Sequence, residues 1–190
     1  MPMVENGLSI GNRVIAVARS LVESGAVVGN VGNVSARIGA GFIVTPSRRP
    51  YGEIEATDLA HVLGGEASGP LAPSREWRLH AAVYDARPEV GAVVHTHSPH
   101  ATAWSFLGED LAPALEDNEY YETGPIRTAP PAPGGSAELA AGAARTLGRS
   151  RAVLLGRHGV LATGASPEQA ALVAAVVERQ AQVAWLLRGA

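Results

Sequence analysis

The stretch Val93-Val94-His95-Thr96-His97-Ser98-Pro99 joins an apolar run to two histidines that are one residue apart. Side chains alternate between the two faces of an extended strand, so residues i and i+2 point the same way. The stretch therefore predicts a buried strand over 90–95 that presents His95 and His97 to one side. Two imidazoles on one side can bind one divalent metal, and a metal at the end of such a strand favours catalysis over a structural role.

The composition predicts a single domain over 1–190. The 190 residues are 46% hydrophobic, enough for one sizeable core. A net charge of −3 with 17% charged residues gives no electrostatic reason to expect nucleic acid as a partner. The first six residues lack the basic region and apolar core of a signal peptide, and no apolar run of membrane-spanning length is evident. We therefore expect a cytoplasmic protein with no membrane partner.

The chain contains no cysteine. This excludes disulfide scaffolds, cysteine-rich zinc sites and thiol nucleophiles. Any metal must therefore be bound by histidines and carboxylates.

Helical and extended patterns alternate along the chain and predict one α/β domain. Helices are expected over 8–24, from an N-cap at Ser74 to the residue before Pro88, and over 99–107, 136–147 and 167–187. Strands are expected over 36–38, 41–45, 90–95, 152–155 and 160–163. The glycine- and asparagine-rich residues 29–35 predict a turn, and residues 108–135 a loop on the active-site side with short strand pieces.

Two further residues complete a candidate metal site. His158 lies in a turn between two short apolar runs, and Glu76 opens the helix that follows Ser74. A catalytic zinc site often has three protein ligands and one open position, which His158 would complete. Taken alone, a histidine such as His158 is more often an ordinary turn residue than a ligand, and a carboxylate such as Glu76 is more often a helix cap. Their occurrence together in a chain without cysteine favours metal binding.

The remaining histidines are given other roles. His80 falls on the apolar face of its helix and is expected to be structural. His61 belongs to no pattern and is expected at the surface. His100 follows the histidine pair closely and is a candidate to support the metal ligands from behind.

Seven segments occur in an order and spacing that resemble the class II aldolase/adducin family. They are 32–37 (GNVSAR), 44–47 (VTPS), 73–76 (PSRE), 79–84 (LHAAVY), 87–88 (RP), 93–98 (VVHTHS) and 158–159 (HG). The resemblance covers nearly the whole chain, from about Leu8 to Leu187.

This resemblance implies a three-layer α/β/α fold around a central, mostly antiparallel sheet. It also implies a divalent metal, with Zn²⁺ expected and Mn²⁺, Co²⁺ or Fe²⁺ also suited to the ligands, and a homo-oligomer, expected to be a tetramer. By position, His95, His97 and His158 match the metal-ligating histidines. Glu76 matches the carboxylate that ligates the free metal and acts as acid/base when substrate is bound.

The substrate side combines matches with departures. Asn33, Ser47 and Ser74 match parts of the family's phosphate pocket. Arg48 stands where the family has glycine, and Arg75 where it has a second serine. Because arginine binds planar anions through a bidentate fork, Arg48 and Arg75 are predicted to bind a substrate phosphate or carboxylate. The alternative is that both point to solvent or to a neighbouring subunit.

Two tyrosines are candidates for a catalytic acid. The sequence stops at Ala190 and is expected to lack the tail that carries a tyrosine into the neighbouring site of the family's sugar-phosphate aldolases. Tyr120 or Tyr121 matches the region of another catalytic tyrosine, although both would equally serve in packing.

The predicted function is that of a divalent-metal-dependent carbon–carbon lyase. Its reaction is aldol or retro-aldol cleavage of a small anionic hydroxy-carbonyl substrate, with Glu76 as acid/base beside a metal-stabilised enediolate. The first alternative is a metal-dependent decarboxylase of an aromatic or keto acid on the same fold. A sugar-phosphate dehydratase or epimerase, or a non-catalytic adducin-like interaction module, ranks below both. The family's epimerases carry aspartate where Glu76 stands.

Overall fold

A computed structural model of the protein describes residues 7–112 and 115–188. Its central element is one large β-sheet. Its eight strands lie in the order β4-β3-β2-β1-β5-β8-β7-β6. The strands are β1 (Gly32–Ile38), β2 (Gly41–Val44), β3 (Ala60–Leu63), β4 (Glu66–Ser68), β5 (Ala92–Thr96), β6 (Arg127–Ala129), β7 (Ala152–Leu155) and β8 (Gly159–Gly164). Every pairing is antiparallel except that of β6 with β7. The predicted mostly antiparallel sheet is confirmed.

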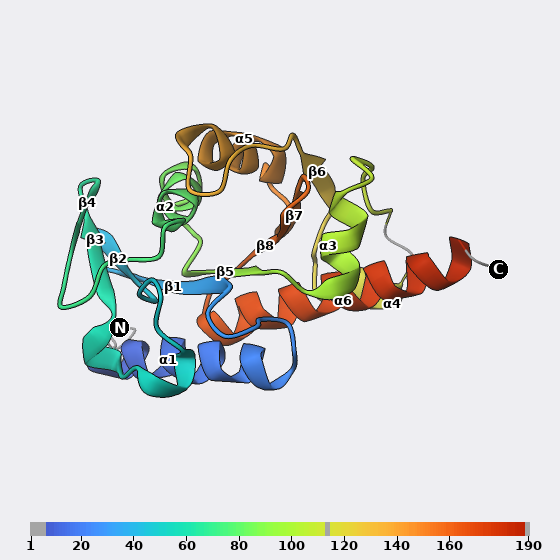
Figure 1. The fold of residues 1–190 in the computed structure, drawn as a ribbon. Helices are drawn as coiled ribbons and strands as arrows, with labels where there is room; N and C mark the ends of the chain where they lie inside the picture. Colours follow the sequence, from blue (N-terminus) through green and yellow to red (C-terminus); the bar gives the residue numbers. More distant parts are fainter. Residues whose placement is uncertain (1–6, 113–114, 189–190) are drawn as a thin grey trace.

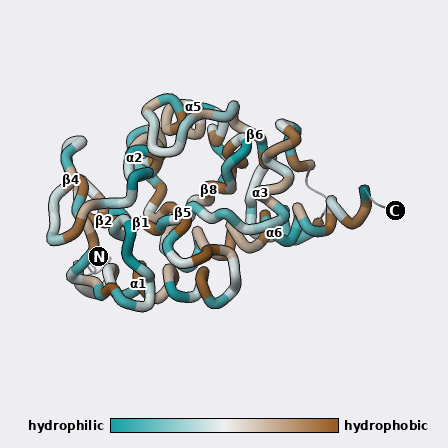
Figure 2. Tube along the Cα trace, viewed as in Figure 1, coloured by the Kyte–Doolittle hydropathy of each residue, from teal (hydrophilic) through white to brown (hydrophobic). Residues whose placement is uncertain are grey.

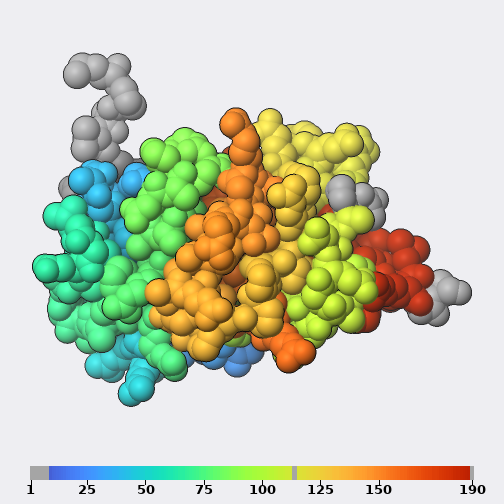
Figure 3. All heavy atoms as spheres, turned by 90° about the horizontal axis from the view of Figure 1, so that it is seen from above, coloured from blue at the N-terminus to red at the C-terminus, as the bar shows by residue number. Residues whose placement is uncertain are grey.

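Helices cover both faces of this sheet. They are α1 (Gly7–Glu23), α2 (Trp77–Ala86), α3 (Pro99–Ser105), α4 (Glu116–Tyr120), α5 (Ala137–Leu147) and α6 (Pro167–Arg188), with short 3-10 turns η1 (Tyr51–Glu53) and η2 (Ala56–Asp58). Helices α2 and α5 lie on one face, and α1 and α6 on the other (Figure 1). Figure 3 looks down on the α2/α5 layer, where α5 crosses the middle in orange. The predicted three-layer α/β/α fold is therefore present.

Strand alternation divides the core into two halves. Ala92 and Val94 of β5 join the apolar cluster under α1 and α6. Val93, between them, joins the cluster under α2 and α5. His95 is two residues beyond Val93 and so lies on the α2/α5 face. In Figure 2 the tube of α6 changes repeatedly between brown and teal, as expected for a helix with only part of its surface against the core.

Strand β5 is the central element for the site. All five of its residues are buried, and its run of alanine and valine suits a strand covered on both faces. It pairs with β1 so that Asn33 lies opposite His95, and with β8 so that Leu161 does. The strand ends before Pro99, which opens α3 and cannot donate to a sheet ladder.

Two sequence predictions at the N-terminal half need correction. Residues 29–35 are not all turn, because β1 already begins at Gly32. A Cβ at Gly32 would lie 2.7 Å from the carbonyl oxygen of His95, so this glycine permits close strand approach. Strands β3 and β4 were not predicted, although Gly64 and Gly65 between them both have positive φ, as a hairpin turn requires.

Two other boundaries differ from prediction. Helix α2 begins at Trp77 rather than directly after Ser74, and Glu76 occupies its N-cap position. The predicted loop over 108–135 contains the short helix α4 as well as the expected strand piece, β6. The other expected helices and strands lie within a few residues of their predicted bounds.

Helix α6 is, by length and composition, long and apolar enough to cross a membrane. The expectation that no apolar stretch reaches this length is therefore wrong. In the structure α6 packs against β8, β5 and α3, and its buried residues include Val173 and Val177. A core helix of this kind passes the same test, so the finding is weak support for a membrane span.

Candidate metal centre

Glu76, His95, His97 and His158 converge at one end of the central strands. One ligand atom from each lies within 4.8 Å of all the others. The Nε2 atoms of His95 and His97 are 2.9 Å apart. The three rings pack edge to face, with centroids 4.8 to 4.9 Å apart. The structure thus brings together all four predicted metal ligands.

Backbone contacts set the orientation of His95. Its Nδ1 lies 2.9 Å from the carbonyl oxygen of Val160 on the neighbouring strand β8. A carbonyl can only accept, so Nδ1 donates to it and Nε2 is left facing the cluster. The side chain is fully buried, which holds Nε2 in one direction.

The approach of His158 depends on the glycine after it. A Cβ at Gly159 would lie 2.4 Å from the carbonyl oxygen of Thr96 and 3.3 Å from both His95 and His97. Only a residue without a side chain lets the turn before β8 come this close to β5. The backbone N–H of His158 also donates to Leu155 O at 2.9 Å, which closes the turn.

Glu76 faces the histidines instead of capping its own helix. Its Oε2 is 3.3 Å from His95 Nε2, and its Oε1 is 3.2 Å from His158 Nε2. No side chain caps α2, and the backbone N–H of Glu76, its N-cap residue, donates to Ser74 Oγ at 3.3 Å. Asn33 Nδ2 donates to Oε2 at 3.0 Å. The carboxylate is therefore held from two sides.

The electrostatics of the cluster favour a cation. Burial alone would raise the pKa of the Glu76 carboxyl, but its interactions with His158 and His95 outweigh burial and hold that pKa well below its usual range. Burial, reinforced by His95 and His158, lowers the pKa of His97 to about 4. The site at neutral pH thus combines an ionised carboxylate with a neutral His97.

The carboxylate and the three imidazoles of this cluster fit a divalent metal chemically. Apart from the His158 Nε2 atom 3.2 Å away, buried Glu76 Oε1 has no polar partner, which is costly unless another group satisfies it. Nitrogen and oxygen donors in this number suit Zn²⁺ and neighbouring transition metals. These four side chains are therefore compatible with binding a metal ion together.

The cluster opens into a cavity of about 320 Å³. The predicted substrate-side residues all line it: Asn33, Ser47, Arg48, Ser74 and Arg75. Two loops form this wall, joined where Ser74 N donates to Thr45 O at 3.1 Å and Ser47 N to Ala72 O at 2.9 Å. The residues predicted to bind the substrate anion therefore line the same cavity as Glu76, His97 and His158.

Arg48 and Arg75 are exposed at the rim of this cavity. Throughout residues 7–112 and 115–188, no side chain or carbonyl pairs with either guanidinium. Arg48 adopts a left-handed backbone with φ of 58°, a conformation that favours glycine. With its amide oxygen facing the loop, Asn30 accepts from the N–H groups of Arg48 and Arg49 at 2.9 and 3.0 Å. The loop thus keeps its glycine-like shape while offering a cationic side chain.

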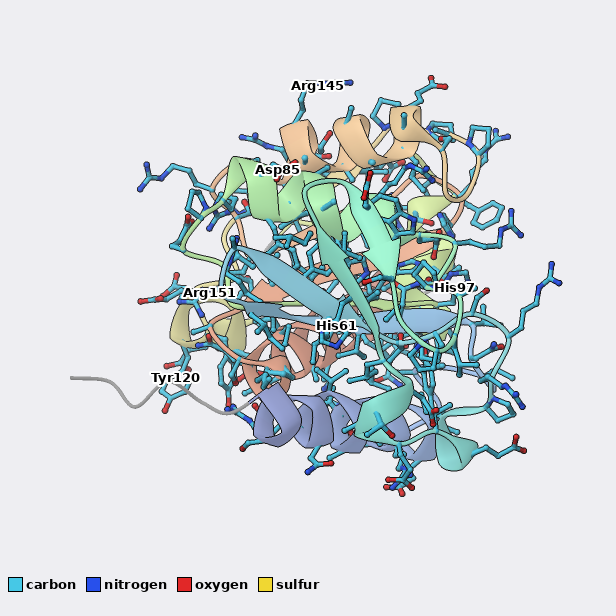
Figure 4. All side chains as sticks on the ribbon, turned by 90° about the vertical axis from the view of Figure 1, so that its left-hand side faces the viewer. His61, Asp85, His97, Tyr120, Arg145 and Arg151 are labelled. Atoms are coloured by element: carbon cyan, nitrogen blue, oxygen red, sulfur yellow. The ribbon has the colours of Figure 1, made fainter. Side chains whose placement is uncertain are left out.

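The tyrosines lie elsewhere. Tyr120 ends α4 and is 79% exposed, and in Figure 4 it lies on the opposite side of the molecule from His97. Neither Tyr120 nor Tyr121 lines the cavity beside Glu76. A catalytic role for either would require a site completed by a neighbouring copy, and it stays a prediction.

The other histidines are placed as follows. His80 is fully buried, as predicted, and His61 on β3 is exposed, as predicted. His100 does not support the metal ligands, because its Nδ1 bonds to Glu178 of α6 at 2.7 Å. That contact ties α3 to α6 and lies outside the cluster.

Sequence reasoning missed the groups that orient the ligands. Val160 acts through its carbonyl, which has no side-chain signature. Asn33 was predicted as a phosphate contact, and its bond to Glu76 follows only from the β1–β5 register. The dipeptide 158–159 was noticed as a motif, and only the structure shows why its glycine is needed.

A cysteine-free cluster of three imidazoles and a carboxylate beside a cavity is the arrangement expected of a metal-dependent enzyme. Residues 12–185 match the family described as "Class II Aldolase and Adducin N-terminal domain", and the chain belongs to this family. The match spans both helical layers and all four cluster residues.

Named relatives support the same class. The chain is 36% identical over 180 residues to the 5-methylthioribulose-1-phosphate/5-deoxyribulose-1-phosphate aldolase of Rhodospirillum rubrum, covering 94% of this chain and 81% of that protein. It is 34% identical to the 3-oxo-tetronate 4-phosphate decarboxylase of Cupriavidus necator, covering 90% and 80%. A solved L-fuculose 1-phosphate aldolase superposes with a TM-score of 0.90 at 30% identity, covering 95% and 86%. The protein is thus a lyase of the class II aldolase family.

Proposed function

We propose that the protein is an aldolase that cleaves a ketose 1-phosphate and releases dihydroxyacetone phosphate. The observation that carries this proposal is the cavity that joins the Glu76–histidine cluster to Arg48 and Arg75. One end of such a pocket stabilises charge on a hydroxy-carbonyl unit, and the other binds an anionic group.

The named relatives share one intermediate. Retro-aldol cleavage of L-fuculose 1-phosphate or 5-deoxyribulose 1-phosphate breaks the bond between C3 and C4, the α- and β-carbons of the C2 ketone. Its electrons then form the enediolate of dihydroxyacetone phosphate. Loss of CO₂ from 3-oxo-tetronate 4-phosphate leaves the same enediolate. The shared requirement is therefore a site for this dianionic three-carbon unit, with the departing aldehyde or CO₂ as the variable part.

Glu76 is assigned the proton transfer at carbon. After cleavage, the carbanionic carbon of the enediolate needs a proton, and in the reverse direction the same carbon must lose one. Glu76 lines the cavity, and its Oε1 has only the His158 ring, 3.2 Å away, beside it, whereas Oε2 accepts from Asn33, so the transfer is assigned to Oε1. A divalent ion at the cluster would stabilise the negative charge on the substrate's carbonyl and hydroxyl oxygens.

Arg48 and Arg75 are assigned the anionic group of the substrate. Their guanidinium groups have no partner within the described residues, and they line the same cavity as Ser47 and Ser74. Two forked cations with two hydroxyls can saturate the oxygens of one phosphate.

The native metal is proposed to be Zn²⁺, because three imidazoles and one carboxylate match its usual donors and number, although Mn²⁺, Co²⁺ or Fe²⁺ would also suit. A homotetramer in the cytoplasm is proposed as the working form. Exposed large apolar side chains, among them Phe106, Leu186 and Leu187, support self-association. Metal analysis of protein purified without added metal, and light scattering that returns the mass of a tetramer, test these two points.

The function is tested by hydrogen exchange into dihydroxyacetone phosphate in D₂O, followed by proton NMR. Protein loaded with Zn²⁺ should exchange the hydroxymethyl hydrogen stereospecifically, and Glu76→Gln should lose at least about a hundredfold in rate. Glu66→Gln, at an exposed carboxylate on β4, is the matched control and should exchange normally. Absence of exchange with Zn²⁺, Mn²⁺, Co²⁺ and Fe²⁺ alike would contradict the proposal.

A decarboxylase is the second candidate, favoured by one specific observation. Two separate unpaired cations at the rim could bind a phosphate and a carboxylate at once, as 3-oxo-tetronate 4-phosphate would need. Both candidates predict exchange into dihydroxyacetone phosphate, so product formation must decide. A higher kcat/KM for 5-deoxyribulose 1-phosphate than for 3-oxo-tetronate 4-phosphate supports the aldolase, and the reverse order supports the decarboxylase.

A further inference from the structure

A chain of hydrogen bonds, here called the relay, runs through the sheet behind Glu76. Its members are Tyr84, Ser35, His80 and Asn33. Tyr84 OH is 2.8 Å from Ser35 Oγ, which is 2.6 Å from His80 Nδ1. His80 Nε2 is 2.5 Å from Asn33 Oδ1, and Asn33 Nδ2 is 3.0 Å from Glu76 Oε2. All four side chains are buried.

The relay has a single consistent direction. A carboxylate only accepts, so the amide nitrogen of Asn33 must face Glu76, and its oxygen must face His80. His80 then carries its proton on Nε2, which leaves Nδ1 as an acceptor for the hydroxyl of Ser35. The Ser35 oxygen in turn accepts from Tyr84. Every proton points toward Glu76, and a chain polarised in one direction strengthens each of its bonds.

The protonation states agree with this direction. Burial, followed by the nearby His95, lowers the pKa of His80 to about 3, so the ring is neutral. Burial also raises the pKa of the Tyr84 hydroxyl, which stays protonated and able to donate. A neutral imidazole has one donor and one acceptor, as a relay member requires.

The far end of the relay is clamped. The ring of Tyr84 packs against Phe42 with centroids 4.9 Å apart, and the guanidinium of Arg37 lies over the Tyr84 ring at 4.6 Å. Arg37 is itself fixed by bonds to the carbonyl oxygens of Tyr84 and Val90, both at 3.0 Å. These contacts therefore hold the Tyr84 end of the relay in one position.

We infer that the relay positions the catalytic carboxylate: it anchors Oε2 of Glu76 and leaves Oε1 as the oxygen that exchanges a proton with the substrate. Tyr84, Ser35 and His80 do not line the cavity. They act as positioning residues, and their effect on turnover must pass through Asn33. The kinetic part of this inference rests on the proposed function, whereas the tautomer of His80 does not.

The test compares Ser35→Ala with Thr163→Val. Ser35, Val93 and Thr163 lie side by side across β1, β5 and β8. Thr163 is as buried as Ser35, and its hydroxyl donates to Arg151 O, outside the relay. The two variants therefore each remove one buried hydroxyl from the same row of the sheet.

Two readouts are made on the full-length protein. Ser35→Ala should lower kcat for exchange into dihydroxyacetone phosphate about tenfold with little change in KM, whereas Thr163→Val should not. Tyr84→Phe, which keeps the packed ring, should give a smaller loss in the same direction. Nitrogen-15 NMR of metal-free protein should show His80 as the neutral Nε2–H tautomer, assigned by its absence in His80→Gln, and Ser35→Ala should reduce that preference.

Each outcome decides a separate point. A wild-type His80 protonated on Nδ1, or on both nitrogens at neutral pH, would overturn the relay whatever the enzyme's activity. Equal kcat losses in Ser35→Ala and Thr163→Val would reduce the relay to a structural role. Absence of exchange in every variant and in the wild type, with the expected tautomer present, would count against the proposed function and leave the direction of the relay standing.

Discussion

The two ends of the cavity are built on opposite principles. At the metal end, His95 is fully buried, and Glu76 is only 13% exposed and bonded to Asn33. At the rim, Arg48 and Arg75 are exposed, and neither guanidinium has a partner within the described residues. The metal end is over-determined by backbone register and buried hydrogen bonds, whereas the rim is cationic and unsatisfied. A rigid cluster of candidate metal ligands is thus combined with an exposed, cationic edge that makes few contacts with the rest of the fold.

The largest effect is expected from removing a ligand at the metal end. His97→Ala should weaken Zn²⁺ binding by at least about a hundredfold, because even outer groups that orient ligands are worth ten- to a hundredfold. Competition with a chelator of known affinity measures this. His61→Ala, at an exposed histidine on β3, should bind Zn²⁺ as the wild type does. Equal affinity in the two variants would break the assignment of the ligands.

Lowering the pH should reduce the stability of the folded protein through His80. The pKa of His80 is about 3 in the folded protein and 6.5 in the reference state, so below pH 6.5 only the unfolded chain gains this proton. Stability therefore falls as pH falls, by up to about 1.4 kcal/mol per pH unit from this group. Urea unfolding of metal-free protein between pH 6.5 and 4.5 should show a shallower slope in His80→Gln. Parallel slopes would contradict the neutral, buried state of His80.

A methyl group at the turn before β8 should loosen the metal end. In Gly159→Ala the new Cβ would meet the Thr96 carbonyl at 2.4 Å. Relief of that clash should cost about 1–3 kcal/mol of stability and shift His158, with weaker metal binding. Gly52→Ala is the control, because a Cβ at Gly52 meets nothing within 4 Å. Similar unfolding curves for the two variants would show that the close approach is not required.

The smallest effects should come from the rim, and one of them should improve stability. Arg48→Gly relieves a left-handed arginine and should stabilise the fold by up to about 1 kcal/mol. It should also raise KM for a phosphorylated substrate about tenfold, as should Arg75→Ser, because each removes a charged hydrogen-bonding group. Thermal unfolding and steady-state kinetics measure the two effects. An unchanged KM in both variants would remove the proposed anion-binding role.

The contrast also explains what the sequence could and could not predict. His95 and His97 follow from the two-residue period of a strand, and β7 was placed at its observed bounds because its four residues form one buried apolar run. Helix α2 begins at Trp77, later than predicted, and Glu76 at its N-cap turns its side chain to the histidines instead of capping the helix.

The missing parts are those that depend on pairing between distant segments. The relay needs the register that sets Asn33 opposite His95, and local patterns do not encode register. Strands β3 and β4 escaped prediction because they are short, and β4 is exposed throughout. The unpartnered state of Arg48 and Arg75 is a property of the surrounding space, which a local sequence pattern does not describe.

The most direct test of this account is a calorimetric titration of Zn²⁺ into metal-free wild-type protein and into the Arg48→Gly/Arg75→Ser double variant. If the two ends are separable, both proteins bind one ion per chain with Kd values within about twofold of each other, while only the wild type keeps its low KM for a phosphorylated substrate. Failure of the wild type to bind Zn²⁺, or a large loss of metal affinity in the double variant, would contradict the account.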